Sequence, residues 1–230
     1  MKITIIHGQS HKGTTYHLAM MLSDKLEGDV KEFFLPRDFG SFCIGCNACF
    51  STSEKLCPHY EQLKPITAAL DEADLIILAS PVYVYHVTGA MKAFLDHYGH
   101  RWIVHRPNDD MFFKQAVCMS TAAGAGMKST NKDMADNMFF WGIAKIYKYG
   151  IRIKAVTWDD VKDDIRKKME KDTEKLAKKI KKNQFKLRST IKTKMFFYLM
   201  RLYHKNNYSQ ADRDFWNDKG WMGKVRPWKR

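Results

Sequence analysis

Short apolar runs alternate with segments of helical periodicity along most of the 230-residue chain. Apolar runs of about four to eight residues, bounded by turn residues, are typical of buried strands. They recur at residues 2–7, 30–35, 74–79, 115–119 and 150–157. A chain that alternates strand and helix in this way forms a parallel sheet with helices on both faces. The alternation therefore predicts an α/β fold with a doubly wound, five-stranded parallel sheet. We take its strand order to be 2-1-3-4-5, one of the common orders of such sheets.

The segments between these runs carry apolar residues at helical spacing. One predicted helix begins near Thr88, a residue type that caps helix N-termini, and its buried face is formed by Met91, Phe94, Leu95 and Tyr98. The predicted helices run from residue 14, over 61–72, from 88, over 131–144 and over 159–183. We therefore expect one domain over residues 1–183, followed by an extension over 184–230.

The extension contains a predicted helix over Ser189–Asn206. Residues 195–200 of that helix, Met-Phe-Phe-Tyr-Leu-Met, are apolar on nearly all sides. Such a segment is not stable with one side in water. We therefore expect it to lie in a subunit interface of a homodimer or a larger oligomer. Residues 206–230 are expected to form an ordered but irregular arm that contains Phe215, Trp216, Trp221 and Trp228.

The net charge of +14 comes entirely from the last third of the chain. Residues 1–150 contain 15 basic and 15 acidic side chains, whereas residues 151–230 contain 24 and 10. A basic tail with aromatic residues is compatible with binding to a membrane surface or to nucleic acid. The charges on the helix at 159–183, however, lie opposite an apolar stripe, which is typical of a solvated face. We therefore expect neither a membrane nor nucleic acid as a main partner.

Five cysteines are present, and their chemistry depends on the compartment. No apolar run approaches the roughly 20 residues of a transmembrane helix, and the run at residues 3–6 is too short for a secretory signal. We therefore expect a cytoplasmic protein with reduced thiols or ligand cysteines instead of disulfides. Cys118 lies within a strand pattern and is expected to pack in the core.

Three loops are expected to converge where the strand order reverses, because ligands of open α/β sheets bind at this point. Residues 8–15 join a strand to a helix N-terminus, where unpaired N–H groups and the helix dipole favour a phosphate. The loop lacks the pattern of a Walker A loop and of a Gly-x-Gly-x-x-Gly loop. An ordinary strand–helix turn is the alternative interpretation. The candidate phosphate-binding residues are Ser10, Lys12, Gly13, Thr14 and Thr15.

The other two loops suit a flat ring. Residues 80–86 place aromatic side chains on stiff backbone, and residues 121–126 are small enough for a ring to approach backbone N–H groups. The structural alternatives are tyrosines that cap a sheet and a flexible loop. The candidate ring-binding residues are Ser80, Pro81, Val82, Tyr83, Thr121, Gly124 and Gly126. No side chain is assigned as a catalytic acid or base.

Four segments together resemble the NAD(P)H-dependent FMN reductase family of flavodoxin-like proteins. They are Gly8-x-Ser10-x-Lys12-Gly13-x-Thr15, Cys43-x-Gly45-Cys46-x-x-Cys49, Ser80-Pro81-Val82-Tyr83 and Lys92-x-Phe94-x-Asp96. The resemblance covers about residues 1–156. It implies a flavodoxin-like fold, FMN phosphate in the first loop and the isoalloxazine ring between the other two. It also implies NAD(P)H as electron donor and a small molecule or redox protein as acceptor. Thr14 and His11 depart from the commonest family residues but keep hydrogen-bonding capacity.

The remaining four cysteines follow the pattern C-x2-C-x2-C-x7-C. This compact spacing suits three corners of a [4Fe–4S] cluster with a fourth ligand nearby. It also resembles the motif of iron–sulfur flavoproteins, a branch of the same family. Zinc prefers two separated pairs and fits less well, and family members with this segment but no metal are a third alternative. The candidate cluster ligands are Cys43, Cys46, Cys49 and Cys57.

The sequence thus predicts an FMN-dependent NAD(P)H oxidoreductase in which the flavin supplies the chemistry. An iron–sulfur flavoprotein that relays single electrons is the alternative enzyme. A non-enzymatic carrier resembling flavodoxin is less favoured, because such carriers are typically acidic and this chain is basic.

Overall fold

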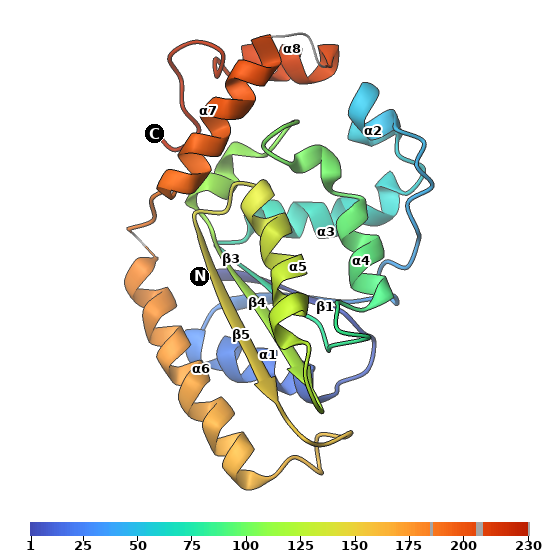
Figure 1. The fold of residues 1–230 in the computed structure, drawn as a ribbon, viewed down its shortest axis with the longest axis vertical. Helices are drawn as coiled ribbons and strands as arrows, with labels where there is room; N and C mark the ends of the chain where they lie inside the picture. The colour runs from blue at the N-terminus through green and yellow to red at the C-terminus, as the bar shows by residue number, and fades with distance from the viewer. Residues whose placement is uncertain (185, 206–208, 230) are drawn as a thin grey trace.

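The computed structural model describes residues 1–184, 186–205 and 209–229, and Figure 1 shows its ribbon. Its strands are β1 (Lys2–His7), β2 (Asp29–Phe34), β3 (Leu75–Ala79), β4 (Gln115–Ala122) and β5 (Lys145–Arg152). Every neighbouring pair is parallel, and the order is β2-β1-β3-β4-β5. The predicted fold class and strand order are confirmed. The order reverses between β1 and β3, where a ligand crevice is expected in this architecture.

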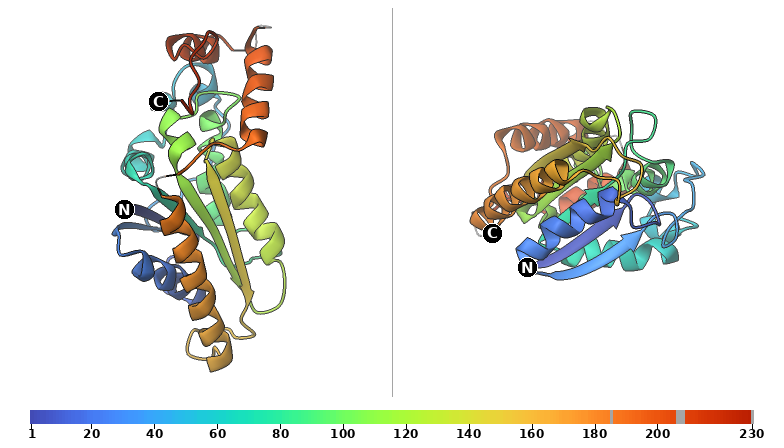
Figure 2. Two further views of the ribbon diagram at one scale, coloured as in Figure 1. Left: turned by 90° about the vertical axis from the view of Figure 1, so that its left-hand side faces the viewer. Right: turned by 90° about the horizontal axis from the view of Figure 1, so that it is seen from below.

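Helices cover both faces of the sheet. On one face α1 (Thr14–Leu26) and α6 (Asp163–Asn183) lie side by side, and Figure 2 shows this pair. The other face is covered by α3 (Tyr60–Glu72), α4 (Gly89–Asp96) and α5 (Met127–Phe140). The connections and the extension contain α2 (Ala48–Ser51), η1 (Glu54–Leu56), η2 (Gly99–Arg101), η3 (Asp109–Phe113), α7 (Ile191–Lys205) and α8 (Gln210–Asp218).

The central strand β3 contributes side chains to the hydrophobic cores under both helical layers. All five of its residues are apolar and buried, as expected for a parallel strand covered on both faces. Because side chains alternate along a strand, Ile76 and Leu78 join the core under α3, α4 and α5. Leu75 and Ile77 join the core under α1 and α6.

The starts of three predicted elements differ from the structure by four or five residues. β5 begins at Lys145, before the predicted residue 150, because it is an edge strand and its mixed Lys-Ile-Tyr-Lys-Tyr pattern does not form an apolar run. α5 begins at Met127, before the predicted residue 131, because Gly126 at φ 99° starts the helix. α6 begins at Asp163 instead of residue 159, because Thr157 and Asp160 hydrogen-bond within a turn at 2.6 Å.

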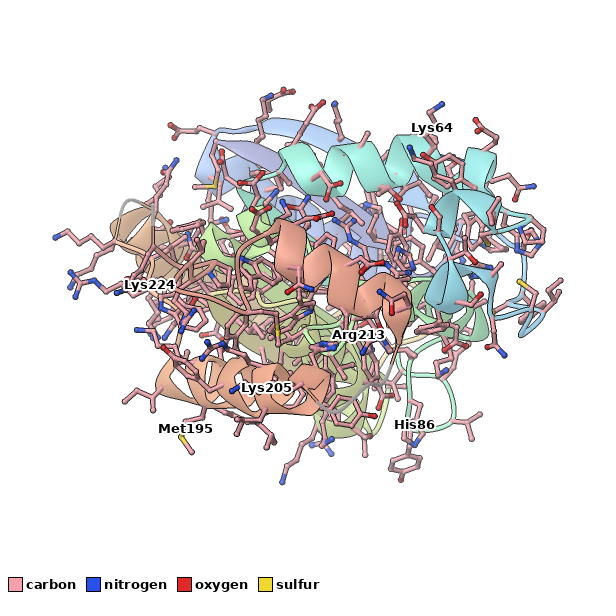
Figure 3. All side chains as sticks on the ribbon, turned by 90° about the horizontal axis from the view of Figure 1, so that it is seen from above. Lys64, His86, Met195, Lys205, Arg213 and Lys224 are labelled. Atoms are coloured by element: carbon pink, nitrogen blue, oxygen red, sulfur yellow. The ribbon has the colours of Figure 1, made fainter. Side chains whose placement is uncertain are left out.

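The extension packs on its own chain through an aromatic cluster. Ile103 and Phe112, which lie between α4 and β4, contact Phe197, Trp216 and Trp221 in this cluster. The inner face of α7 is therefore buried, whereas Met195 on its outer face points away from the body and is 67% exposed (Figure 3). The structure thus covers one side of the apolar helix, and a partner subunit on the other side stays a prediction.

The end of the chain is more regular than the predicted irregular arm. Residues 210–218 form α8, and Ser209 caps it by accepting a hydrogen bond from the Asp212 N–H. The Ser-x-x-Asp spacing is typical of a helix N-terminus. The prediction of an irregular arm was based on the aromatic residues of this segment and did not use that spacing. The predicted end of the preceding helix, Asn206, lies outside the described residues. Among those residues, no helix is both long and apolar enough to span a membrane.

Candidate functional site

The loops that follow β1, β3 and β4 meet at the carboxyl edge of the sheet. The Gly8 N–H donates to the Ala79 carbonyl at 2.7 Å, which joins the first loop to the end of β3. The Val82 N–H donates to the Thr121 carbonyl at 3.0 Å, which joins the second loop to the end of β4. The hydroxyls of Thr15, in the first turn of α1, and of Thr121 lie 2.6 Å apart. Thr121 was predicted in the third loop but lies in β4, which runs to Ala122. The structure therefore brings the three predicted loops together.

The start of α1 is open for an anion. Its N-cap residue, Gly13, provides no side-chain hydrogen bond to the N–H groups of the first turn. Thr14 is buried, and its hydroxyl has no hydrogen-bond partner among the residues that the structure describes. Leaving a buried hydroxyl unpaired costs about 1–3 kcal/mol, so a ligand that pairs with it is favoured. Ser10 and Lys12 lie exposed beside this helix start. This set of donors fits the phosphate of FMN.

The second loop ends in a strained two-residue hairpin. The backbones of Tyr83 and His86 exchange hydrogen bonds of 2.9 and 3.0 Å. Between them, Val84 and Tyr85 have φ values of 48° and 67°, and a β-branched residue at positive φ is an outlier. The Ser129 hydroxyl donates to the Tyr85 carbonyl and holds the turn. The sequence did not predict this hairpin, because neither Val nor Tyr is a typical residue for such a turn.

The third loop needs its glycine at 126. A Cβ atom there would lie 2.6 Å from Cγ1 of Val82 and 3.0 Å from Cα of Tyr85. The small residue therefore lets the hairpin approach the start of α5. At Gly124, by contrast, a Cβ atom would meet nothing within 4 Å. Pro81 and Val82 are half-buried at this point, and Tyr83 is exposed.

The four cysteines gather on the segment between β2 and α3. Cys49 lies in α2, and the other three are found in the turns on either side of it. All four are free thiols. Burial raises the pKa of the Cys49 thiol, and its neighbours Cys57, Cys43 and Cys46 raise it further. Four thiols that interact in this way are a donor set that fits a [4Fe–4S] cluster.

This segment lies away from the three loops within one chain. Thr88, at the start of α4, donates to the Gly8 carbonyl at 2.6 Å. Past the end of α4, Gly99 packs against the ring of Phe50 in the cysteine segment. α4 has eight residues and therefore spans about 12 Å. In Figure 1, α2 lies near the top and the arrowheads of β4 and β5 point to the bottom.

Arg106 ties the cysteine segment to the extension. Its guanidinium donates to the backbone carbonyls of Cys49 and of Phe50, the latter at 3.2 Å. It also pairs with Asp212 of α8, whose carboxylate is fully buried and accepts a second bond from His105 at 2.8 Å. Sequence reasoning missed this buried ion pair, because its members are more than 100 residues apart.

The fold is that of a flavodoxin-like protein, and its three loops form a candidate cofactor site at the switch point of the sheet. Residues 1–151 match the family model described as NADPH-dependent FMN reductase, and the chain belongs to this family. It is similar to an iron-sulfur flavoprotein of Archaeoglobus fulgidus, with 26% identity over 191 residues, 79% of this chain and 80% of that protein.

Two solved structures share the fold. An NAD(P)H:quinone oxidoreductase from Methanothermobacter marburgensis has a TM-score of 0.59 and 14% identity, and the match covers 78% of this chain and 96% of that one. An FMN-dependent NADH-azoreductase from Bacillus anthracis in complex with FMN has a TM-score of 0.54 and 12% identity, over 77% and 100% of the two chains. Both matches show that the fold is shared. Because the chain belongs to the family described as NADPH-dependent FMN reductase, it is an NAD(P)H-dependent FMN oxidoreductase, as the sequence resemblance implied.

Proposed function

We propose that the three loops bind FMN and that the four cysteines bind a [4Fe–4S] cluster, so that NAD(P)H is oxidised at the flavin and acceptors take single electrons at the cysteine segment. When bound, FMN exchanges two electrons with a nicotinamide and one or two with an acceptor, and the cluster exchanges one. The observation that carries the FMN site is the unpaired, buried hydroxyl of Thr14 at the uncapped start of α1.

The residues of the three loops have distinct roles in this proposal. Ser10, Lys12 and the first turn of α1 bind the phosphate, because they lie at the positive end of the helix dipole. The hairpin around Tyr83 covers the ring, and the backbone from Thr121 to Gly126 leaves room for the ring edge. The Thr15–Thr121 hydrogen bond fixes the position of the phosphate-binding part of the site relative to the ring-binding part.

The cluster is supported by the cysteine donor set and by the iron-sulfur flavoprotein name of the relative from Archaeoglobus fulgidus. Because α4 separates the cysteine segment from the three loops, the two kinds of acceptor can bind at different surfaces. Small two-electron acceptors such as quinones would meet the flavin edge. A redox protein would meet the exposed segment that carries Cys43 and Cys46.

The FMN site is tested with Thr14→Val, which removes only the unpaired hydroxyl. We expect FMN affinity to fall about fivefold to tenfold, the loss of one hydrogen bond, while the apoprotein is no less stable. Thr173→Val is the matched control, because the Thr173 hydroxyl bonds within α6 at 2.8 Å, far from the loops. Unchanged FMN affinity in Thr14→Val would place the phosphate elsewhere.

The cluster is tested on protein purified without oxygen, by iron and sulfide assay and by the visible spectrum. We expect about four irons per chain, and a loss of iron in Cys43→Ser. In the same variant, reduction of ferricyanide by NADPH should fall while reduction of a benzoquinone persists. Cys118→Ala, in the core, should keep its iron. If iron-free protein still reduced both acceptors, the result would support an enzyme with FMN alone and would contradict the cluster.

A further inference from the structure

Three metal-ligating side chains meet at the end of α4 that faces the cysteine segment. Cys57 and His59 lie in the turn between η1 and α3, and His97 is the C-cap residue of α4. One ligand atom of each lies within 4.8 Å of the other two. Nδ1 of His59 and Nε2 of His97 are 2.9 Å apart. The two histidines have no part in the FMN loops or in the four-cysteine pattern.

The ring of His97 is held so that one nitrogen lone pair faces this cluster. Its Nδ1 is 2.7 Å from the Ala93 carbonyl, and since a carbonyl only accepts, Nδ1 carries the proton. Nε2 of the neutral ring is therefore an acceptor. Phe39 packs edge-on at 4.8 Å and fixes the ring plane. Metal-ligating histidines are oriented by such a bond from the other nitrogen.

The remaining two ligands can adjust to an ion. His59 is the half-buried N-cap residue of α3, and its side chain makes no capping bond. Two nitrogens at about 2.0–2.1 Å from a tetrahedral zinc ion lie about 3.3–3.4 Å apart, so the His59–His97 pair opens by roughly 0.5 Å. The ion takes the place of the hydrogen between Nδ1 of His59 and Nε2 of His97. That proton moves to Nε2 of His59. Cys57 releases its thiol proton to solvent.

We propose that Cys57, His59 and His97 bind one divalent transition-metal ion, with water as the fourth ligand. One thiolate and two imidazoles suit a borderline ion such as Zn²⁺ or Fe²⁺. Mg²⁺ and Ca²⁺ prefer oxygen ligands and are not bound. The site shares Cys57 with the four-cysteine set, so one chain holds either this ion or a cluster. The histidines belong to the mononuclear site alone, and Cys43 belongs to the cluster alone.

The site is tested by titrating chelator-treated, reduced protein with Co²⁺ in the absence of oxygen. We expect one Co²⁺ per chain, with the visible bands of a tetrahedral ion and a thiolate charge-transfer band, and displacement by Zn²⁺ but not by Mg²⁺. His59→Ala and Cys57→Ser should each weaken Co²⁺ binding by at least about 100-fold, as expected when one of three ligands is lost. His86→Ala, on the exposed hairpin, is the matched histidine control.

The same variants separate this site from the cluster. Cys43→Ser should bind Co²⁺ like the wild type, whereas His59→Ala should still take up iron and sulfide and bind FMN. Thermal unfolding of each apoprotein checks that the half-buried His59 is not needed for folding. The proposal is overturned if His59→Ala binds Co²⁺ normally, if Cys43→Ser abolishes binding, or if wild type binds none at micromolar concentration.

Discussion

Gly126, in the third of the loops proposed to bind FMN, has no room for a side chain. It has φ 99°, and a Cβ atom would clash with Val82 and with the backbone of Tyr85. We predict that Gly126→Ala destabilises the protein by about 1–3 kcal/mol, because a side chain strains this conformation. The hairpin must also shift, so FMN affinity should fall by at least about tenfold. Denaturant unfolding and fluorimetric FMN titration measure the two effects.

Gly124→Ala is the control for the effect on stability, since a Cβ atom there would meet nothing within 4 Å among the residues that the structure describes. It should change the free energy of unfolding by no more than about 0.5 kcal/mol. If Gly124→Ala destabilised the protein as much as Gly126→Ala, the loss would come from reduced flexibility of the loop and not from close contact at residue 126.

At the scale of elements, α8 holds α2, the short helix that contains Cys49, in position through Arg106. Asp212 is buried against Arg106, and Arg106 holds the Cys49 and Phe50 carbonyls. Removing one charge of a buried pair leaves the other uncompensated. We predict that Asp212→Asn lowers the free energy of unfolding by about 3 kcal/mol. Hydrogen exchange should accelerate in residues 48–51 as well as in α8.

Asp214→Asn is the matched control on the same helix, because Asp214 is exposed and accepts a hydrogen bond from the Gln210 side chain within α8 at 2.6 Å. It should leave exchange in α2 unchanged. Faster exchange in α8 alone after Asp212→Asn would mean that the extension does not hold the cysteine segment.

The elements that the sequence predicted best are those with a strong local signal. β3 is a continuous apolar run, β1 carries three isoleucines in six residues, and Thr88 caps α4 as expected by accepting from the Met91 N–H. The three loops follow from this topology, since strand order alone determines which loops meet. Local signals fail where contacts with distant residues determine the structure. The first half of edge strand β5, residues 145–149, is identified only by its pairing with β4.

The same reasoning explains what was missed in the candidate site. The hairpin at Val84 is held by Ser129 from another element, and no local pattern predicts a β-branched residue at positive φ. The approach of His59 to His97 depends on how the segment before α3 packs against the end of α4. The spacing of the four cysteines along the sequence identified them as candidate ligands. Spacing does not identify His59 and His97 as partners, because they are 38 residues apart and meet only in the fold.

At the scale of the whole molecule, several histidines make stability depend on pH. Burial lowers the pKa of His7 and of His204, and it lowers that of His100 to about 3. The unfolded chain, with a histidine pKa near 6.5, therefore takes up protons first as the pH falls. This contribution to stability is present above about pH 6.5 and is lost below it, by at most about 1.4 kcal/mol per histidine at pH 5.5.

We therefore predict that urea unfolding gives a lower free energy at about pH 5.5 than at about pH 7.5, and that His100→Gln reduces this difference by about 1 kcal/mol. His11→Gln is the exposed control and should leave the difference unchanged. A pH dependence that is identical in His100→Gln and in wild type would show that His100 is protonated in the folded protein.

The outer face of α7 is where we predict that a second copy of the chain binds. An exposed apolar face of this kind on a folded protein marks an interaction site. The extension is strongly basic, so two copies repel each other, and salt should strengthen their association by screening. Binding to an anionic surface would instead weaken with salt. The exposed apolar residues of this face are Ile191, Met195, Tyr198, Leu199, Leu202 and Tyr203.

Light scattering at increasing protein concentration tests this prediction. Wild type should have the mass of a dimer, and the dissociation constant should fall between low and moderate salt. Leu199→Asp combined with Leu202→Asp should give a monomer, because two carboxylates would be buried in the interface. Val156→Asp changes an apolar residue that is 92% exposed elsewhere on the surface and should stay dimeric. A double variant that remains a dimer would move the interface away from α7.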